Sequence, residues 1–215
     1  MNQIPSSLFL RDARRPITIL LVILVLLIAY VSPWVLAEGA SLSLNAYDLA
    51  EWSSLHPAAR SAQPALLPSL LLRLPLVCTT IALACVAAGS PRTWRTLGLL
   101  GALVAVIALL PPLEFLRVGT GDANYQQLLA LAGLSLIGAA TVYFGAGFLV
   151  THHIILALTM LCLGSGLWGW YQGFRLIEGF GIAVYPGPGP ILLAAASIIL
   201  IIFSISKTKR PYNPA

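Results

Sequence analysis

Long apolar stretches, separated by short polar connections, limit most strongly what this chain can fold into. Because the apolar core of a bilayer is about 30 Å thick, a helix of roughly 20 apolar residues crosses it. Six stretches reach or approach that length: Ile17–Ala37, Leu66–Gly89, Leu97–Leu113, Gln126–Gly147, Thr151–Tyr171 and Pro190–Ser206. We therefore predict an all-α fold, a polytopic transmembrane helical bundle of about six spans.

The overall composition argues against soluble classes of protein. Of the 215 residues, 59% are hydrophobic and 9% are charged, whereas a soluble domain carries about 25% charged residues. The net charge is +5, but the basic residues form no stripe with interleaved aromatic residues, so no nucleic-acid partner is expected. The expected partners are the lipid bilayer and other membrane subunits.

The basic residues are distributed unevenly between the two sides of the predicted membrane. An even number of spans places both termini on one side. Eight bases would lie on that side, namely Arg11, Arg14, Arg15, Arg92, Arg95, Lys207, Lys209 and Arg210. Only Arg60, Arg117 and Arg175 would lie on the other side. Because Lys and Arg are enriched in cytoplasmic connections, we predict a multi-pass protein of the cell inner membrane with both termini in the cytoplasm.

This topology divides the chain into three parts. Residues 1–16 form a cytoplasmic N-terminal segment, 17–206 the transmembrane domain and 207–215 a basic cytoplasmic tail. The first apolar stretch also resembles a signal peptide, with a cleavage site at Val35-Leu36-Ala37. Since the apolar stretch continues through Trp34 and Leu36, we favour its retention as the first span.

In two of the connections on the predicted outer side, the sequence predicts local structure. The first is long enough for an amphipathic helix, Ala46–Leu55, that places Tyr47, Leu49 and Trp52 toward lipid or protein. Another ends in Tyr185-Pro186-Gly187-Pro188-Gly189-Pro190. Alternating proline cannot continue a helix or pair fully as a strand, so a stiff, extended approach to the last span is expected.

Arg73 is the basic residue that falls inside a predicted span. A charge at bilayer depth is costly and suggests function by default. It lies about two turns from the outer end, between Pro68 and Pro75, which free backbone carbonyls for it to contact. We favour snorkelling or an ion pair with an acid of an outer connection. The alternative is a small-molecule ligand bound by Arg73, Trp52 and Trp168.

The remaining reactive residues predict no catalytic or metal centre. No nucleophile, metal or nucleotide motif is present. His152 and His153 are adjacent, so on a helix they point about 100° apart and cannot share one iron. The cysteines, Cys78, Cys85 and Cys162, lack metal-ligand spacing.

The acids of the predicted outer connections are interpreted as solvated charges. They are Glu38, Asp48, Glu51, Glu114, Asp122 and Glu178. Neither an enzyme nor a cofactor is expected.

Pairs of small residues four positions apart predict close contacts between helices. Lipid provides no hydrophobic drive for helix association, so small side chains that allow backbones to approach mark interfaces. The candidate packing residues are Ala84, Ala88, Gly98, Ala102, Ser135, Ala139, Gly169 and Gly173.

Two functions follow from these patterns. The first is a non-enzymatic accessory or scaffold subunit of a membrane complex. The second is a small-solute transport component with an outward-facing site. Six spans, both termini inside and about 200 residues resemble the substrate-binding component of energy-coupling-factor importers. That resemblance covers topology only, and the AxxxA face expected on the first helix is missing from Ile17–Ala37, so we do not assign the chain to that family.

Overall fold

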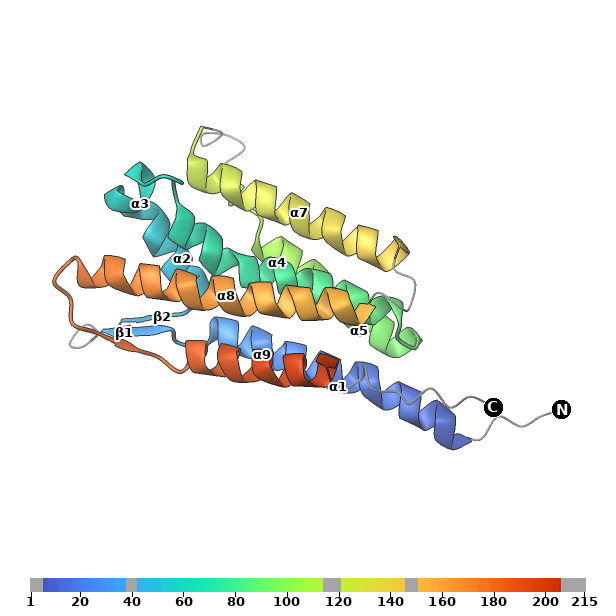
Figure 1. Ribbon diagram of the computed structural model, residues 1–215. Helices are drawn as coiled ribbons and strands as arrows, with labels where there is room; N and C mark the ends of the chain where they lie inside the picture. Colours follow the sequence, from blue (N-terminus) through green and yellow to red (C-terminus); the bar gives the residue numbers. More distant parts are fainter. Residues whose placement is uncertain (1–5, 38–41, 114–120, 146–150, 206–215) are drawn as a thin grey trace.

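The computed structural model describes residues 6–37, 42–113, 121–145 and 151–205, and this part of the chain is mostly helical (Figure 1). Its helices are α1 (Ser6–Val31), α2 (Ala46–Leu55), α3 (Pro57–Ser61), α4 (Leu67–Ala88), α5 (Arg92–Ala108), α7 (Ala123–Gly145), α8 (Thr151–Glu178) and α9 (Gly189–Ile205). Its strands are β1 (Val35–Ala37), β2 (Ser43–Leu44) and β3 (Val184–Pro186). The predicted helical fold is confirmed.

The longer helices lie along one axis of an elongated molecule (Figure 1). At one end lie α2, α3 and the small sheet, which we together call the cap. The beginning of α1 and the end of α9 lie at the opposite end (Figure 1). Among the described residues, three helical segments are long and apolar enough to cross a membrane: Leu67–Ala88, Ala123–Gly145 and His153–Glu178. The apolar segments Ile17–Val31 and Gly189–Ile205 are shorter.

Helix α4 is the centre of the bundle. It packs against α5, α7 and α8 along its length, and α1 and α2 also contact it. Of its most apolar stretch, 78% is buried, against 22% for α7 and 33% for α8. On the other side of the bundle, α9 packs against both α1 and α8. The two outer helices α5 and α7 are thus held mainly by their contact with α4.

The first helix ends earlier than the predicted Ala37. Helix α1 stops at Val31, and Val35–Ala37 forms β1, which pairs antiparallel with β2 on one side and β3 on the other. Proline disfavours helical backbone in the residue before it and cannot donate a helical hydrogen bond, so Ser32-Pro33 ends the helix. The prediction of a helix through Ala37 is wrong for this reason.

Trp34 ties the sheet to the helices. Its side chain is fully buried, and its Nε1 donates to the Ala29 carbonyl at 2.8 Å. Its own carbonyl accepts from the Gly187 N–H at 3.0 Å and from Trp170 Nε1 of α8 at 3.1 Å. A Cβ at Gly187 would collide with the Pro33 carbonyl, and one at Gly189 with the Trp34 ring. These close contacts explain why glycine alternates with proline here.

The last two connections differ in detail from the expected boundaries. The extended approach to the last helix is present as β3, which pairs at the edge of the sheet, where a proline is tolerated. Helix α8 continues past the predicted Tyr171 to Glu178, and α5 ends at Ala108 rather than Leu113. The expected turn at 145–147 falls mostly outside the described residues, and Glu38 and Glu114 lie outside them entirely.

The small residues lie at several helix contacts. A Cβ on Gly169 would come within 2.8 Å of the Leu72 backbone nitrogen of α4, and one on Gly173 within 3.0 Å of the Leu49 side chain of α2. On α5, a Cβ on Gly98 would meet Ala87 of α4 at 3.1 Å. Ala84, Ala102 and Ser135 are buried, whereas Ala88 and Ala139 are partly exposed.

Gly169→Ala is therefore expected to push α8 away from α4. The obstacle is backbone, which cannot rotate away, so we expect a loss of about 1–3 kcal/mol, as for an overpacked core. The measurement is the thermal unfolding of the detergent-purified protein. Gly164→Ala on the same helix is the matched control, because nothing lies within 4 Å of a Cβ there. Equal melting temperatures for the two variants would contradict the close α4–α8 contact.

Candidate functional site

Arg73 is fully buried on α4, near the end of the bundle that carries the cap. Its Nη2 donates to Glu51 Oε1 of α2 at 2.5 Å, and its Nη1 donates to Gln127 Oε1 of α7 at 2.9 Å. Of the two expectations for Arg73, snorkelling or an ion pair with an acid of a connection, the structure has the ion pair. Among the described residues, the acid is Glu51, whose side chain is 34% exposed.

Two further polar groups complete the arrangement. Glu51 Oε2 accepts from Asn124 Nδ2 of α7 at 3.2 Å. Gln127 Nε2 donates to the Leu66 carbonyl, directly before α4, at 3.4 Å. We call Glu51, Arg73, Asn124 and Gln127 the Arg73 cluster. It joins α2, α4 and α7 mainly through side-chain hydrogen bonds, with one further bond to the Leu66 carbonyl.

Local capping interactions hold the partners of Arg73 in position. The Asn45 side chain accepts from the Asp48 N–H at 3.0 Å and thereby starts α2, one turn before Glu51. At the start of α7, Asp122 Oδ1 accepts from the Asn124 N–H at 2.8 Å. The same carboxylate pairs with Arg60 of α3 at 3.3 Å. Each helix that contributes to the cluster therefore begins close to it.

The prolines of α4 do not supply the expected hydrogen-bond partners for Arg73 in the described part of the chain. We expected Pro68 and Pro75 to release backbone carbonyls for Arg73, but the described hydrogen bonds of its guanidinium go to the side chains of Glu51 and Gln127. Pro75 is buried inside α4, and its carbonyl accepts from Thr79 Oγ1 at 2.7 Å. Side chains satisfy a cation better here because a carboxylate also cancels its charge.

Several buried polar atoms in and around the cluster lack a hydrogen-bond partner within the described part of the protein. Among the described residues, the buried atoms Arg73 Nε, Asn124 Oδ1, Ser69 Oγ and Tyr30 Oη have no hydrogen-bond partner. Ser69 lies one turn before Arg73 on the same face of α4. Burial raises the pKa of Tyr47 above 10, nearby Glu51 raises it further and Arg73 opposes this. Tyr47 therefore presents a neutral phenol beside the charged pair.

The two tryptophans predicted to share a ligand with Arg73 lie elsewhere. Trp52 is 38% exposed and packs edge-on against Phe180, with ring centroids 5.7 Å apart. It follows Glu51 on α2 and so points about 100° away from it around the helix. Trp168 is 55% exposed and stacks on Tyr171. In the described part of the chain, the hydrogen bonds and the ion pair of Arg73 involve neither tryptophan.

Sequence reasoning missed Asn124 and Gln127. A signal was available, because these two polar residues lie three positions apart and therefore on one face, in the first turns of a helix that is mostly apolar after them. Glu51 was one of several acids treated as solvated charges, and its spacing could not distinguish it from the others. Only the fold of the cap over α4 selects it.

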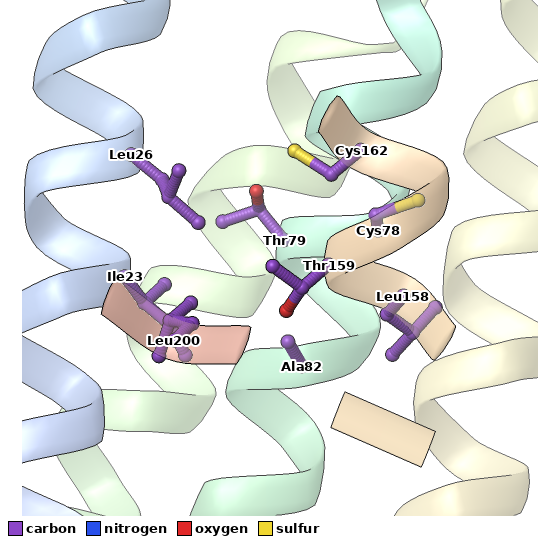
Figure 2. A pocket seen from close by; sticks show the side chains of 9 residues that line it. All are labelled: Ile23, Leu26, Cys78, Thr79, Ala82, Leu158, Thr159, Cys162 and Leu200. Carbon is purple, nitrogen blue, oxygen red and sulfur yellow. The ribbon is translucent and has the colours of Figure 1, made fainter. Parts of the chain in front are cut away.

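A small cavity lies in the apolar interior, and none of its lining residues belongs to the Arg73 cluster (Figure 2). Its volume is about 10 Å³, and it is lined by Ile23, Leu26, Cys78, Thr79, Ala82, Leu158, Thr159, Cys162 and Leu200. The hydroxyl groups of Thr79 and Thr159 donate to carbonyls of their own helices. Figure 2 shows the sulfur atoms of Cys78 and Cys162 pointing to different sides. The described residues contain no group of three His, Cys, Asp or Glu able to hold a metal.

Comparison of the chain with protein-family models, curated protein sequences and solved structures gives no match. The chemistry of the site is therefore argued from its geometry. Arg73 contacts a carboxylate and two helices of its own protein, and its side chain has no exposed surface. This arrangement is suited to holding the cap against the bundle.

Glu51→Ala is expected to loosen that attachment. The substitution leaves Arg73 buried without a counter-charge, which costs about 3 kcal/mol. Glu178→Gln is the matched control, because Glu178 pairs with Arg175 on the exposed surface, where an ion pair contributes less than about 1 kcal/mol. Thermal unfolding in detergent compares the two variants. A loss no larger than that of the control would show that Arg73 does not depend on Glu51.

Proposed function

We propose that this chain is a six-span integral membrane protein, with both termini in the cytoplasm, that serves as a non-enzymatic accessory or scaffold subunit of a membrane complex. The observation that carries the proposal is the distribution of polar and apolar groups. The buried cation Arg73 is paired within the protein, while large apolar side chains cover the outside of the bundle.

The apolar exterior supports the membrane assignment. Exposed large apolar residues include Leu100, Leu103, Val104 and Ile107 on α5, Leu129, Leu134, Leu136 and Ile137 on α7, and Ile191, Ile198, Ile199 and Ile202 on α9. Soluble monomers rarely expose contiguous apolar surface of this kind, which in membrane proteins contacts lipid or partner helices. The faces of α5, α7 and α9 are therefore the surfaces that a partner subunit would contact.

The arrangement of the helices supports six spans. The helices α1, α4, α5, α7, α8 and α9 run back and forth along one axis (Figure 1). The two shortest, α5 and α9, each contain 17 residues, or about 26 Å of helix. Arg92 and Arg95 lie at the start of α5, at the end opposite the cap. Such basic residues are typical of the cytoplasmic side, so the cap would face outward.

The alternative function, a solute-transport component, depends on an outward site formed by Arg73, Trp52 and Trp168. Arg73 is fully buried and bound by Glu51 and Gln127, which weighs against its contact with a solute. Arg73 lines neither the cavity between Cys78 and Cys162 nor the open groove beside Trp170 and Arg175. We therefore favour the accessory or scaffold role.

Labelling of introduced cysteines tests the orientation of the chain. Ser61→Cys lies in the cap and Thr93→Cys at the start of α5, and both positions are exposed. The three native cysteines are buried, so they should react slowly with the reagent. In intact cells, an impermeant maleimide should label Ser61→Cys at once, but Thr93→Cys only after permeabilisation. Labelling of both from the same side would contradict the six-span topology.

Purification in a mild detergent tests the subunit role. We expect the protein to stay in carbonate-washed membranes and to copurify with another membrane polypeptide in a fixed ratio. Recovery of the protein alone, with no partner retained after cross-linking in membranes, would contradict the role as a subunit. If a small solute copurifies in place of a polypeptide, the result would favour the alternative function, a solute-transport component.

A further inference from the structure

The surface at the end of α8 contains an open groove of about 250 Å³. Its walls are Trp170, Tyr171, Phe174, Arg175 and Glu178 of α8, together with Pro186 of β3. It combines aromatic rings, one cation and one anion within three turns of helix. We propose that this groove binds the headgroup of a zwitterionic phospholipid, with the phosphate on Arg175 and the ammonium on Glu178. The inference rests on the proposed membrane location.

The walls of the groove are held in a fixed arrangement. Trp170 Nε1 donates to the Trp34 carbonyl at 3.1 Å, and the Gly187 N–H, next to Pro186, donates to the same carbonyl at 3.0 Å. The helix wall and the strand wall are thus attached to one backbone atom. Phe174 packs edge-on against Trp170, with ring centroids 6.0 Å apart. A groove that is already formed binds with less loss of conformational entropy.

The groove lies at the depth of lipid headgroups. Helix α8 has 28 residues, about 42 Å, which exceeds the bilayer core of about 30 Å. Arg175 and Glu178 lie in its last turn, where charged side chains reach the interface. Tryptophan and tyrosine prefer the same level of the membrane, and Trp168, Tyr171 and Tyr185 are each at least half exposed nearby. The acyl chains would follow the apolar surface of α8 inward.

The charged pair matches both charges of the headgroup. Arg175 Nη1 donates to Glu178 Oε2 at 3.2 Å, and the side chains are 66% and 41% exposed. An exposed pair of this kind is weak. Among the described contacts, the other guanidinium N–H groups and Glu178 Oε1 have no protein partner. A phosphate oxygen accepts from the guanidinium, an ammonium group lies against the carboxylate, and the aromatic rings also attract a cation.

Native mass spectrometry of the full chain in detergent tests the groove. The probes are phosphatidylethanolamine and phosphatidylglycerol with identical acyl chains, since the second has the phosphate but no ammonium. We expect wild type to prefer phosphatidylethanolamine. Arg175→Gln should weaken both lipids by about threefold to tenfold, whereas Glu178→Gln should weaken phosphatidylethanolamine alone and remove the preference. Phosphoethanolamine, which has no acyl chains, should compete only weakly.

Arg60→Gln is the matched control, because Arg60 is also an exposed arginine at the cap but pairs with Asp122 outside the groove. It should leave both affinities unchanged. Equal binding of the two lipids by wild type, an equal loss in Arg60→Gln, or phosphoethanolamine binding as tight as the lipid would overturn the proposal. Carbonate extraction separates the outcomes: a chain that stays in the membrane but shows no headgroup preference disproves the groove alone, whereas an extracted chain disproves the membrane location.

Discussion

The buried ion pair between Arg73 and Glu51 is the interaction on which the organisation of this protein depends. A guanidinium inside an apolar bundle is tolerated only with a counter-charge and further hydrogen bonds. Glu51 comes from α2 and Gln127 from α7. The side chain of Arg73 therefore connects the central helix α4 to both the cap and α7.

Trp34 provides a second attachment, on the other side of the cap. Its carbonyl binds α8 through Trp170 and the last connection through Gly187. The Arg73 cluster holds the cap by charge and polar side chains, whereas Trp34 holds it by backbone pairing and a buried ring. This second attachment also forms the groove at the end of α8, because Trp170 in one wall and Gly187 beside the other both donate to the Trp34 carbonyl.

The sequence predicted the long helices, though not all of their ends, because long apolar stretches without turn residues favour helices. It also predicted α2 over Ala46–Leu55, as an amphipathic helix in the first long connection. The prediction of a helix was wrong at Val35–Ala37. A short apolar run is compatible with a helix or a strand, and here the pairing with β3 makes it a strand. Arg73 was recognised as unusual, but its partner depends on which loop acid folds over α4. That information lies in long-range packing, which residue spacing does not encode.

A double-mutant cycle on the central pair measures this dependence most directly. Glu51→Ala leaves a buried cation without its counter-charge, and Arg73→Met removes the cation while filling similar space. If the pair acts as described, Arg73→Met in the Glu51→Ala background should recover at least about 1 kcal/mol, since no charge is then buried alone. Additive losses of stability in the double variant would show that the two side chains do not depend on each other and would contradict the account.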